Sequence, residues 1–453
     1  MRRPLTCFKA YDVRGRLPDE LNESIAFRIG RAFAQWLRPE TVVVGHDIRL
    51  SGPALLDAVI AGLSAEGSRA IHIGPCGTEE IYFATGSLKA GAGIMVTASH
   101  NPADWNGMKF VRAGAQPVSG DSGLDLVRSL AEAMDDPADL RSGTSLPARV
   151  DNRGDYVKHL LTYVDRSVLA PLTIVVNAGN GSAGPVIDKL EPELPFRFVK
   201  VHHEPDGRFP HGVPNPLLPE NRAATRAAVI AASADLGVAW DGDFDRCFFF
   251  DERGEFIEGY YVVGLLAEAM LARQPGGRVI HDPRLIWNTQ EIVAAAGGTA
   301  IQSKTGHAFI KERMRAEDAV YGGEMSAHHY FRDFAYCDSG MIPWLLVAQL
   351  LCRSGRPLSS LVSERIERFP VSGEINRRVT DPAGAIGRVR ERYASEARRE
   401  DLTDGLGLEF ADWRFNLRLS NTEPVIRLNV EARGDARLLA VRRDEILSLL
   451  DGD

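Results

Sequence analysis

Cysteine is scarce in this 453-residue chain, which has five cysteines and no Cys-x-x-Cys pair. An odd, scattered set argues against a disulfide framework and a thiolate zinc site, and it fits a reducing compartment. Long apolar runs are also missing. The longest one, near residues 341–352, is too short to span a bilayer, and the first residues lack the apolar core of a signal peptide. We therefore expect a soluble, cytoplasmic protein without a membrane partner.

Excess positive charge is absent as well. Lys and Arg total 53 against 61 Asp and Glu, so the formal net charge is −8. Without a basic run, the phosphate-gripping surface of a nucleic-acid-binding protein is not expected. Small anionic substrates are not excluded, because one pocket can still be positive. The 44% hydrophobic and 25% charged residues are ordinary for globular proteins and argue against long disordered or fibrous regions.

One pattern occurs three times along the chain: an apolar run, a polar loop, a helix-like segment and a second apolar run. The copies span residues 42–73, 173–201 and 278–301. Strands that alternate with helices indicate βαβ units. We therefore predict three similar α/β domains with mainly parallel, mixed sheets.

The C-terminal region has a different pattern. Residues 413–419 and 425–431 alternate between apolar and polar side chains, which predicts two strands joined by a polar loop. Helical patterns at 384–398 and 436–450 flank them. We predict an α+β domain here, and the four predicted domains are 1–145, 146–250, 251–368 and 369–453.

Four segments carry groups suited to chemistry, and the first is Thr97-Ala98-Ser99-His100-Asn101-Pro102. It follows a predicted strand, so Ser99 is well placed to be an exposed nucleophile or a phosphate carrier. The alternative is a turn whose serine and asparagine side chains bond to their own backbone. For this segment alone the turn is favoured.

The second segment holds three aspartates, Asp241, Asp243 and Asp245. Alternate residues of an extended strand point the same way, so the three carboxylates can converge. A cation would relieve their repulsion, and hard oxygen ligands suit Mg²⁺. An EF-hand calcium loop is rejected, because Arg246 stands where that loop needs glycine and residues 248–250 read as a buried strand. The alternative is a solvated acidic turn.

The third segment is Gly322 to His329, where Glu324, Ser326 and His328 alternate. An extended loop could aim all three at one ligand, and their polar groups suit sugar hydroxyls. A polar loop without a function is as good an interpretation of this segment alone.

The fourth segment runs from Arg418 to Pro424, with Arg427 beyond it. Small hydroxyl side chains, backbone N–H groups and arginines are the usual parts of a phosphate-binding nest. Taken alone, such a segment is more often a hairpin loop.

In this order and at these separations, the four segments resemble those of the α-D-phosphohexomutase superfamily, and bacterial phosphomannomutases and phosphoglucomutases most of all. Phe8–Gly15 and Lys304–Lys311 are similar to two further segments of that family. The resemblance extends from Phe8 to about Arg433, nearly the whole chain.

The resemblance implies four domains around a central cleft and an intramolecular phosphotransferase. Such an enzyme interconverts mannose 6-phosphate and mannose 1-phosphate through a phosphoserine and a hexose 1,6-bisphosphate, which also acts as activator, and it uses Mg²⁺. Glucose phosphates are expected as further substrates. The implied partners are small hexose phosphates, with no nucleic acid, and the implied state is a monomer or weak dimer.

The resemblance also assigns roles to single residues. Ser99 carries the phosphoryl group and ligates the metal with Asp241, Asp243 and Asp245. The catalytic residues are Ser99, Lys109, Arg246, His307 and His328; Arg246 contacts the phosphoserine, and the acid or base is left open among Lys109, His307 and His328. The substrate-binding residues are Tyr11, Arg14, Arg284, Glu324, Ser326, His328, Arg418, Ser420, Asn421, Thr422 and Arg427.

Other functions stay open on the sequence. Within the same fold, the enzyme could prefer glucose phosphates or act on glucosamine phosphates. From other classes, a metal-dependent phosphatase that uses Ser99 and a non-catalytic sugar-phosphate sensor are alternatives.

Overall fold

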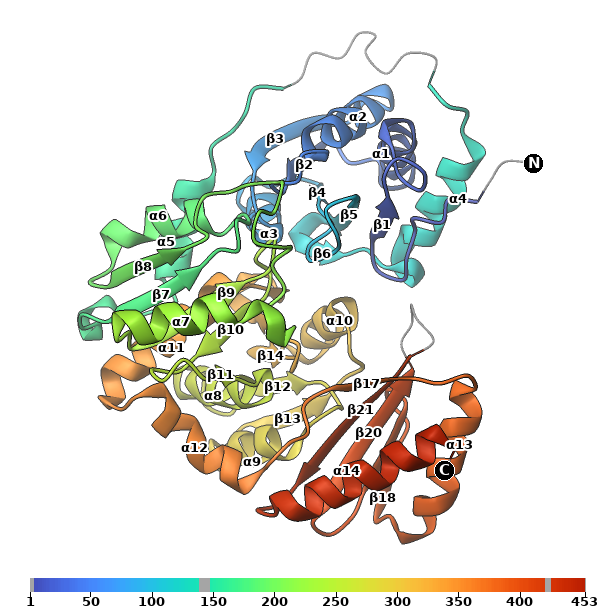
Figure 1. Ribbon diagram of the computed structural model, residues 1–453. Helices are drawn as coiled ribbons and strands as arrows, with labels where there is room; N and C mark the ends of the chain where they lie inside the picture. Colours follow the sequence, from blue (N-terminus) through green and yellow to red (C-terminus); the bar gives the residue numbers. More distant parts are fainter. Residues whose placement is uncertain (1–3, 138–146, 420–424, 453) are drawn as a thin grey trace. The chain divides into compact units, whose positions relative to one another are not determined.

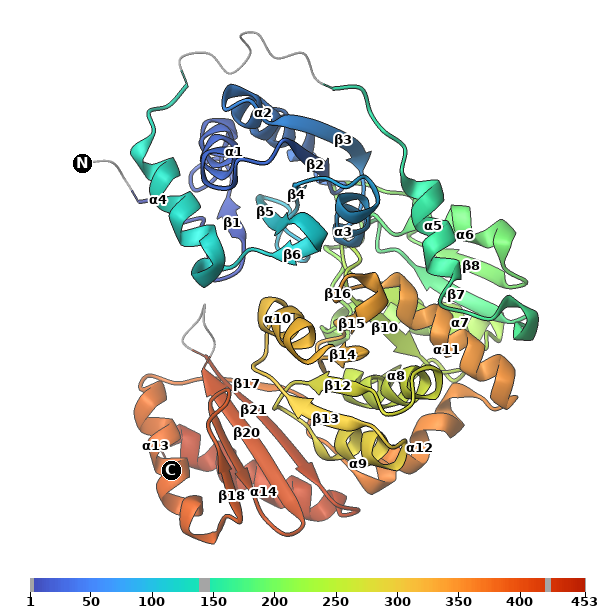
Figure 2. The same cartoon turned by 180° about the vertical axis from the view of Figure 1, so that it is seen from behind.

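The computed structural model describes residues 4–137, 147–419 and 425–452. The chain forms two compact units, and each of them is built from two stretches of sequence. The first unit contains Met1–Phe256 and His328–Gly355, and the second contains Ile257–Ala327 and Arg356–Asp453. The chain therefore leaves the second unit after Ala327 and returns to it at Arg356. Figures 1 and 2 show the elements of both units from opposite sides.

The first sheet of the first unit is mixed. Its strand order is β1-β5-β4-β2-β3, with β6 paired to β5. Strand β2 runs parallel to β3 and β4, whereas β5 is antiparallel to β4 and β1. The elements are β1 (Val13–Arg16), α1 (Glu23–Leu37), β2 (Thr41–His46), α2 (Gly52–Ala65), β3 (Arg69–Pro75), α3 (Thr78–Ser87), β4 (Ala92–Val96), β5 (Trp105–Arg112), β6 (Gln116–Pro117) and α4 (Asp125–Ala133).

Helices α1 and α2 lie side by side against this sheet (Figure 1). The Asn22 side chain caps α1 by accepting a hydrogen bond from the backbone of Ile25 at 3.0 Å. Where the helices cross, a Cβ atom on Gly30 would collide with the carbonyl oxygen of Val59. Glycine at this crossing lets the two backbones approach closely, so the helices cover the sheet as one layer.

The second sheet of the first unit follows the same plan. Strand β7 runs parallel to β8 and β9, and β10 is antiparallel to β9. The elements are α5 (Arg153–Leu161), β7 (Thr173–Asn177), α6 (Gly184–Leu190), β8 (Arg197–Val201), α7 (Ala223–Ala232), β9 (Leu236–Trp240), β10 (Cys247–Phe250) and, at the passage into the second unit, β11 (Phe256–Ile257). The buried strand β10 agrees with the rejection of a calcium loop.

Residues 328–355 complete the first unit. They form a hairpin of β15 (His329–Phe331) and β16 (Cys337–Asp338), followed by α11 (Met341–Ser354). The indole of Trp240 donates a hydrogen bond to the Gly340 carbonyl at 2.8 Å, and Trp344 packs edge-on against Phe196 and Phe198. These contacts fix the hairpin and α11 to the second sheet.

The second unit holds three parallel strands and an antiparallel sheet. Among the parallel strands, β12 lies between β13 and β14. Its elements are α8 (Gly259–Arg273), β12 (Arg278–His281), α9 (Trp287–Ala295), β13 (Thr299–Gln302), α10 (His307–Glu317), β14 (Tyr321–Gly323) and α12 (Leu358–Arg368).

The antiparallel sheet has the order β17-β21-β20-β19-β18, and α13 and α14 pack on it around one apolar core (Figure 2). The elements are β17 (Ile375–Arg378), α13 (Pro382–Tyr393), β18 (Arg399–Asp401), β19 (Leu406–Glu409), β20 (Trp413–Leu419), β21 (Val425–Ala432) and α14 (Ala436–Asp451).

A buried carboxylate, Glu431, joins these two parts of the second unit. It pairs with Arg414 at 2.7 Å and accepts hydrogen bonds from the Ile286 backbone at 2.7 Å and the Tyr260 hydroxyl at 2.5 Å. Arg414 in turn donates to the carbonyl oxygen of Arg284 at 2.9 Å. Because buried charges are stable only when they are paired and hydrogen-bonded, this network needs both parts of the unit.

The structure confirms the predicted fold class. All three βαβ units are present with parallel strands, and the C-terminal hairpin spans the predicted residues. The predicted helix at 384–398 is wrong at its end: α13 stops at Tyr393, because Arg398 and Arg399 pair with β19 instead. The four domain boundaries remain predictions. Within the described residues, no helix has the length and apolarity to cross a membrane.

Candidate active site

Ser99 lies in the loop that follows β4, where the carboxyl end of that strand meets that of β2. Its backbone is in the left-handed region, with φ = 49°. The Ser99 N–H donates to the hydroxyl of Thr97 at 2.8 Å, and that hydroxyl donates to Asp47 at 2.6 Å. An uncommon backbone conformation for serine is thus held by a buried polar chain, as expected at a functional loop.

Arg49 stabilises the same loop through its side chain. Its buried guanidinium donates to the carbonyl oxygens of Ser99, Asn101, Pro102 and Trp105 at 2.9, 2.6, 2.7 and 3.0 Å. Sequence reasoning missed Asp47 and Arg49. The available signal was their position directly after a predicted strand, since ligands of α/β sheets gather at the carboxyl ends of strands.

The three aspartates lie between β9 and β10 and are buried, with ligand atoms all within 4.8 Å of one another. The structure confirms that the three carboxylates converge, but it does not confirm the predicted extended backbone. The segment is a turn in which Phe244 has φ = 45°, and not an extended strand. The predicted alternation is therefore wrong, because the tight turn brings the carboxylates together instead.

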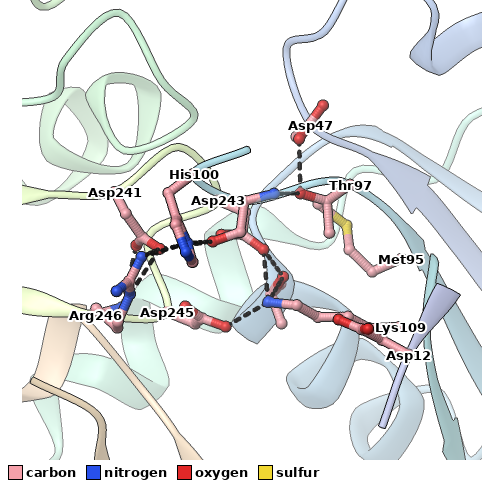
Figure 3. A network of polar contacts seen from close by, with 12 residues as sticks. Asp12, Asp47, Met95, Thr97, His100, Lys109, Asp241, Asp243, Asp245 and Arg246 are labelled. Atoms are coloured by element: carbon pink, nitrogen blue, oxygen red, sulfur yellow. Dashed lines mark hydrogen bonds and ion pairs between the residues drawn. The ribbon is translucent and has the colours of Figure 1, made fainter. Parts of the chain in front are cut away.

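Two cations neutralise this cluster (Figure 3). Lys109, on β5, places its Nζ 2.8 Å from Asp243 and 2.5 Å from Asp245. Burial would lower the pKa of Lys109, but the two carboxylates outweigh it and hold the pKa above its ordinary value. Burial and the charge of Asp243 raise the pKa of Asp245. Lys109 is therefore a fixed positive charge in this arrangement.

The second cation, Arg246, contacts both Asp241 and His100 (Figure 3). Arg246 Nη2 is 2.8 Å from Asp241 and 2.6 Å from His100 Nδ1. The Ser99 hydroxyl donates to Asp241 at 2.8 Å and lies 3.1 Å from His100 Nδ1. Burial and the neighbouring Arg246 lower the pKa of His100 well below its usual value. The serine oxygen thus touches both a carboxylate and a neutral imidazole.

The residues present fit a bound Mg²⁺ ion. Among the described residues, Asp243 Oδ1 and Asp245 Oδ1 are buried without a hydrogen-bond partner. Orphaned carboxylate oxygens are costly unless something binds them, and carboxylate oxygens are the ligands that Mg²⁺ prefers. Asp241 and the Ser99 hydroxyl complete an all-oxygen set.

His328 lies close to Asp245 and Asp338. Its Nδ1 is 3.2 Å from the buried Asp338 carboxylate, and the three groups form a second cluster with ligand atoms within 4.8 Å. The predicted extended segment from Glu324 to His328 is wrong: a turn through Ala327, with φ = 71°, separates them.

Glu324 and Ser326 instead lie against Arg284 in the second unit. Arg284 Nη2 is 3.2 Å from the Ser326 hydroxyl and 3.8 Å from Glu324, and it pairs with Asp282 at 2.8 Å. Glu324 also accepts a hydrogen bond from the Gly306 N–H at 2.9 Å. Gly306 directly precedes His307, a predicted catalytic residue and the first residue of α10. This group offers both donors and acceptors to a ligand.

The Arg284 turn repeats the Arg49 turn. Both are His-Asp-x-Arg segments that begin at the last residue of a strand, His46 of β2 and His281 of β12. In each, the arginine N–H donates to the aspartate at 2.9 Å. Val96 pairs with His46, and Gly323 pairs with His281, so Val96 and Gly323 occupy equivalent positions in the two sheets. Ser99 and Ser326 each follow these positions by three residues.

The predicted phosphate-binding arginines lie in the second unit. Arg418 is 2.9 Å and Arg427 is 3.5 Å from the Glu374 carboxylate, a residue that sequence reasoning missed. The predicted Ser420, Asn421 and Thr422 lie outside the described residues.

Tyr11 and Arg14, the remaining predicted residues, belong to the first unit. Tyr11 lies two residues before β1 and is partly buried. Arg14 pairs with Asp12 at 2.8 Å and donates to the Thr97 carbonyl at 3.1 Å. The structure therefore places Arg14 at the serine loop.

Comparison with known proteins agrees with this geometry. Four domains described as phosphoglucomutase/phosphomannomutase domains I, II, III and IV match residues 6–135, 154–254, 258–369 and 374–448. The chain belongs to the phosphoglucomutase/phosphomannomutase family. This membership confirms the predicted superfamily and the predicted enzyme class, an intramolecular phosphotransferase.

Individual relatives of this phosphoglucomutase/phosphomannomutase family member are similar over nearly their whole length. A phosphomannomutase of Salmonella montevideo is 61% identical over 99% of both chains. A protein of Xanthomonas campestris pv. campestris described as phosphohexose mutases is 60% identical over 99% of this chain and all of its own. A crystal structure of a family protein from Burkholderia thailandensis matches with a TM-score of 0.87 at 32% identity, over 99% and 98% of the two chains.

Proposed function

We propose that the protein is a phosphomannomutase that interconverts mannose 6-phosphate and mannose 1-phosphate. One observation carries the proposal: the Ser99 hydroxyl lies 2.8 Å from Asp241 within a buried cluster of three aspartates. Relatives named phosphomannomutase, at 52–61% identity over nearly the full chain, support mannose phosphates as substrates. Glucose phosphates are proposed as further substrates.

In the proposed reaction Ser99 carries a phosphoryl group. The bond between phosphorus and Ser99 Oγ breaks while a bond to a sugar hydroxyl oxygen forms, which yields a hexose 1,6-bisphosphate. The hydroxyl proton passes to a base, and Ser99 Oγ takes up a proton as it leaves. In the second transfer, Ser99 Oγ gives up that proton as it attacks the other phosphoryl group, and the sugar oxygen that is released takes one up. The bisphosphate turns over between the two transfers and also serves as activator. Phosphoryl transfer depends mainly on positioning and charge neutralisation, so fixed cations matter most.

Arg246 and Lys109 provide those fixed cations beside Ser99. Asp241, Asp243 and Asp245, with the serine oxygen, would hold Mg²⁺, which acts as a Lewis acid on the phosphoryl oxygens when bound. Lys109 would then exchange its pairing with Asp243 and Asp245 for the phosphoryl group. Arg14, which already contacts the serine loop, adds a third positive charge.

His328 is the proposed proton acceptor and donor. Its Nδ1 lies 3.2 Å from the buried Asp338 carboxylate, which orients the imidazole and stabilises its protonated form. Lys109 is less suited, because two carboxylates hold its proton. His307 and Tyr11 are proposed to bind substrate.

The second unit is proposed to recognise the sugar and the phosphate that does not react. Glu324 and Ser326 would bind sugar hydroxyls, and Arg284, Arg418 and Arg427 would bind the phosphate, together with Ser420, Asn421 and Thr422. Hydroxyls shared by mannose and glucose give weak discrimination, because the wrong epimer leaves no buried group unpaired.

A coupled assay tests the function directly. The purified protein is given mannose 1-phosphate or glucose 1-phosphate with Mg²⁺ and a trace of hexose 1,6-bisphosphate, and formation of the 6-phosphate is followed. We expect turnover of both sugars, with specificity constants that differ by less than roughly 10⁴-fold, and none with Ser99→Ala. Steady release of inorganic phosphate without 6-phosphate would instead identify a phosphatase.

A further inference from the structure

One carboxylate, Glu374, is surrounded by three arginines in the second unit. Its oxygens lie 2.9 Å from Arg418, 3.4 Å from Arg284 and 3.5 Å from Arg427. Glu374 directly precedes β17, and its side chain is 23% exposed, whereas those of Arg284 and Arg418 are 3% and 10% exposed. The carboxylate therefore covers two buried guanidinium groups and remains open to solvent itself.

These arginines retain unused capacity for an anion. Among the described residues, Arg284 Nε and Arg418 Nε are buried without an acceptor. A guanidinium binds carboxylate and phosphate with the same forked geometry. A phosphate has more acceptor oxygens than a carboxylate and carries up to two charges. A phosphate on these arginines would thus use N–H groups that Glu374 leaves idle.

The charges already balance without a ligand. Three arginines face Glu374, while Asp282 and Glu324 lie 2.8 and 3.8 Å from Arg284. Burial would raise the pKa of Glu374, but the arginines outweigh it and hold the pKa below its ordinary value. Glu374 is therefore an anion at neutral pH. A phosphate that joined the cluster beside it would meet a like charge at close range.

We infer that Glu374 takes the place of the substrate phosphate in the free enzyme. There it pairs with Arg284, Arg418 and Arg427, and a sugar phosphate displaces it on binding. The inference rests on the proposed function, because it takes these arginines to be the phosphate-binding residues. It assigns Glu374 the role of setting phosphate affinity.

The backbone near Glu374 permits this exchange. Ser372 is fixed to Val430 by two hydrogen bonds of 2.9 Å, one from its N–H and one to its hydroxyl. Gly373 follows with φ = 67° and open space at its Cβ position. The backbone is held on one side by Ser372 and on the other by β17, so rotation of the Glu374 side chain alone suffices to free the arginines.

A competing internal anion suits a mutase. The bisphosphate intermediate must leave the arginines, turn over and bind them again through its other phosphate. An arginine cluster without a competitor would hold the dianion tightly and slow that release. Glu374 offers the arginines a partner at each release, so the release leaves no unpaired buried charge.

The test compares Glu374→Gln with the parent by calorimetric titration of inorganic phosphate and of mannose 1-phosphate. Glutamine keeps the shape but removes the charge, so both ligands should bind at least about 10-fold tighter, since no ion pair with the arginines is given up on binding. Glu374→Asp, whose shorter carboxylate reaches the arginines less well, should also bind phosphate more tightly. In turnover, Glu374→Gln should lower both KM and kcat.

Glu400→Gln is the matched control. Glu400 lies in β18 of the same antiparallel sheet and pairs at the surface with Arg390 of α13. The substitution changes the net charge equally, so any general charge effect appears in both variants. Unchanged or weaker phosphate binding by Glu374→Gln would overturn the inference, since a carboxylate that merely organises the arginines should weaken binding when it is removed. The parent's mutase assay separates the two claims: an inactive parent refutes the proposed function, whatever the variants do.

Discussion

Arg49 donates a hydrogen bond of 2.9 Å to the carbonyl oxygen of Ser99 and holds three further carbonyl oxygens of the same loop. A lysine at this position keeps the charge but not the planar fork. Small displacements of a reacting group can cost about 10²-fold in rate, so Arg49→Lys should lower kcat by that order. Steady-state kinetics measure it, with exposed Arg208→Lys as the control. A kcat equal to that of the parent would show that the loop holds its shape without the fork.

Ser99 should carry phosphate in part of the purified protein. The Ser99 hydroxyl lies beside Asp241 and Arg246 bonds to the same carboxylate, a setting suited to a phosphoryl group. Intact-mass and peptide analysis should find an added phosphate on Ser99 that is absent from Ser99→Ala, and that variant should lose most activity. Phosphate confined to another residue would contradict the assignment.

Asp243→Asn should weaken metal binding and turnover together. Asp243 contributes an orphaned buried oxygen to the cluster, and replacing a carboxylate weakens a hard-ion site. Titration of the metal-free protein with Mg²⁺ gives the affinity, and activity with and without EDTA gives the dependence. Asp188→Asn, an exposed pair with Lys200, is the control. Full activity of the parent in excess EDTA would rule out the metal role.

Arg418→Ala should weaken binding of mannose and glucose phosphates while Ser99 remains phosphorylated. Loss of a charge-assisted hydrogen bond costs about 1.5–3 kcal/mol, which corresponds to about 10- to 150-fold in affinity. Calorimetric titration measures the affinity, and mass analysis measures the phosphoserine. If both sugar phosphates bound as tightly as to the parent, Arg418 would not belong to the phosphate-binding residues.

Acid should destabilise the protein partly through His329. Burial first, and then the charge of His328, lower the pKa of His329 to about 3, against about 6.5 in the unfolded chain. The unfolded state therefore binds a proton as pH falls below 6.5 while the folded state does not. Stability present above pH 6.5 should be lost by up to about 1.4 kcal/mol per pH unit down to pH 3. Denaturation midpoints between pH 7 and 5 should fall less steeply for His329→Gln; an equal slope would contradict this origin.

The sequence was informative where local patterns decide the structure. Alternation predicted β20 and β21, and the βαβ periods predicted three parallel units. The spacing of the three aspartates predicted a metal site, whereas the role of Ser99 was predicted only from the resemblance of the ordered segments to the family. Both predicted extended segments failed, because single residues in the left-handed region, Phe244 and Ala327, turn the chain there, and neither residue type favours that conformation.

Supporting residues were out of reach for another reason. Arg49 acts on a loop 50 residues away, and Glu374 meets Arg284 across 90 residues. The position of Arg49 after a strand does not name its partners, and Glu374 belongs to no local motif, so only the fold brings the partners together. The division into two units is similarly non-local, since residues 328–355 fold with the first unit.

The Glu431 network has a consequence for how the chain is made. Glu431 accepts a hydrogen bond from the N–H of Ile286, which precedes Glu431 by 145 residues. Ribosomes add about 5–20 residues per second, so the growing chain carries these donors for about 7–30 s before their acceptor exists. During that interval residues 257–327 lack the carboxylate that accepts hydrogen bonds from buried Tyr260 and from the first residue of α9, Trp287. Folding of the second unit thus waits until Glu431 has been made, and a nascent chain stalled before Glu431 exposes an incomplete core to chaperones and proteases.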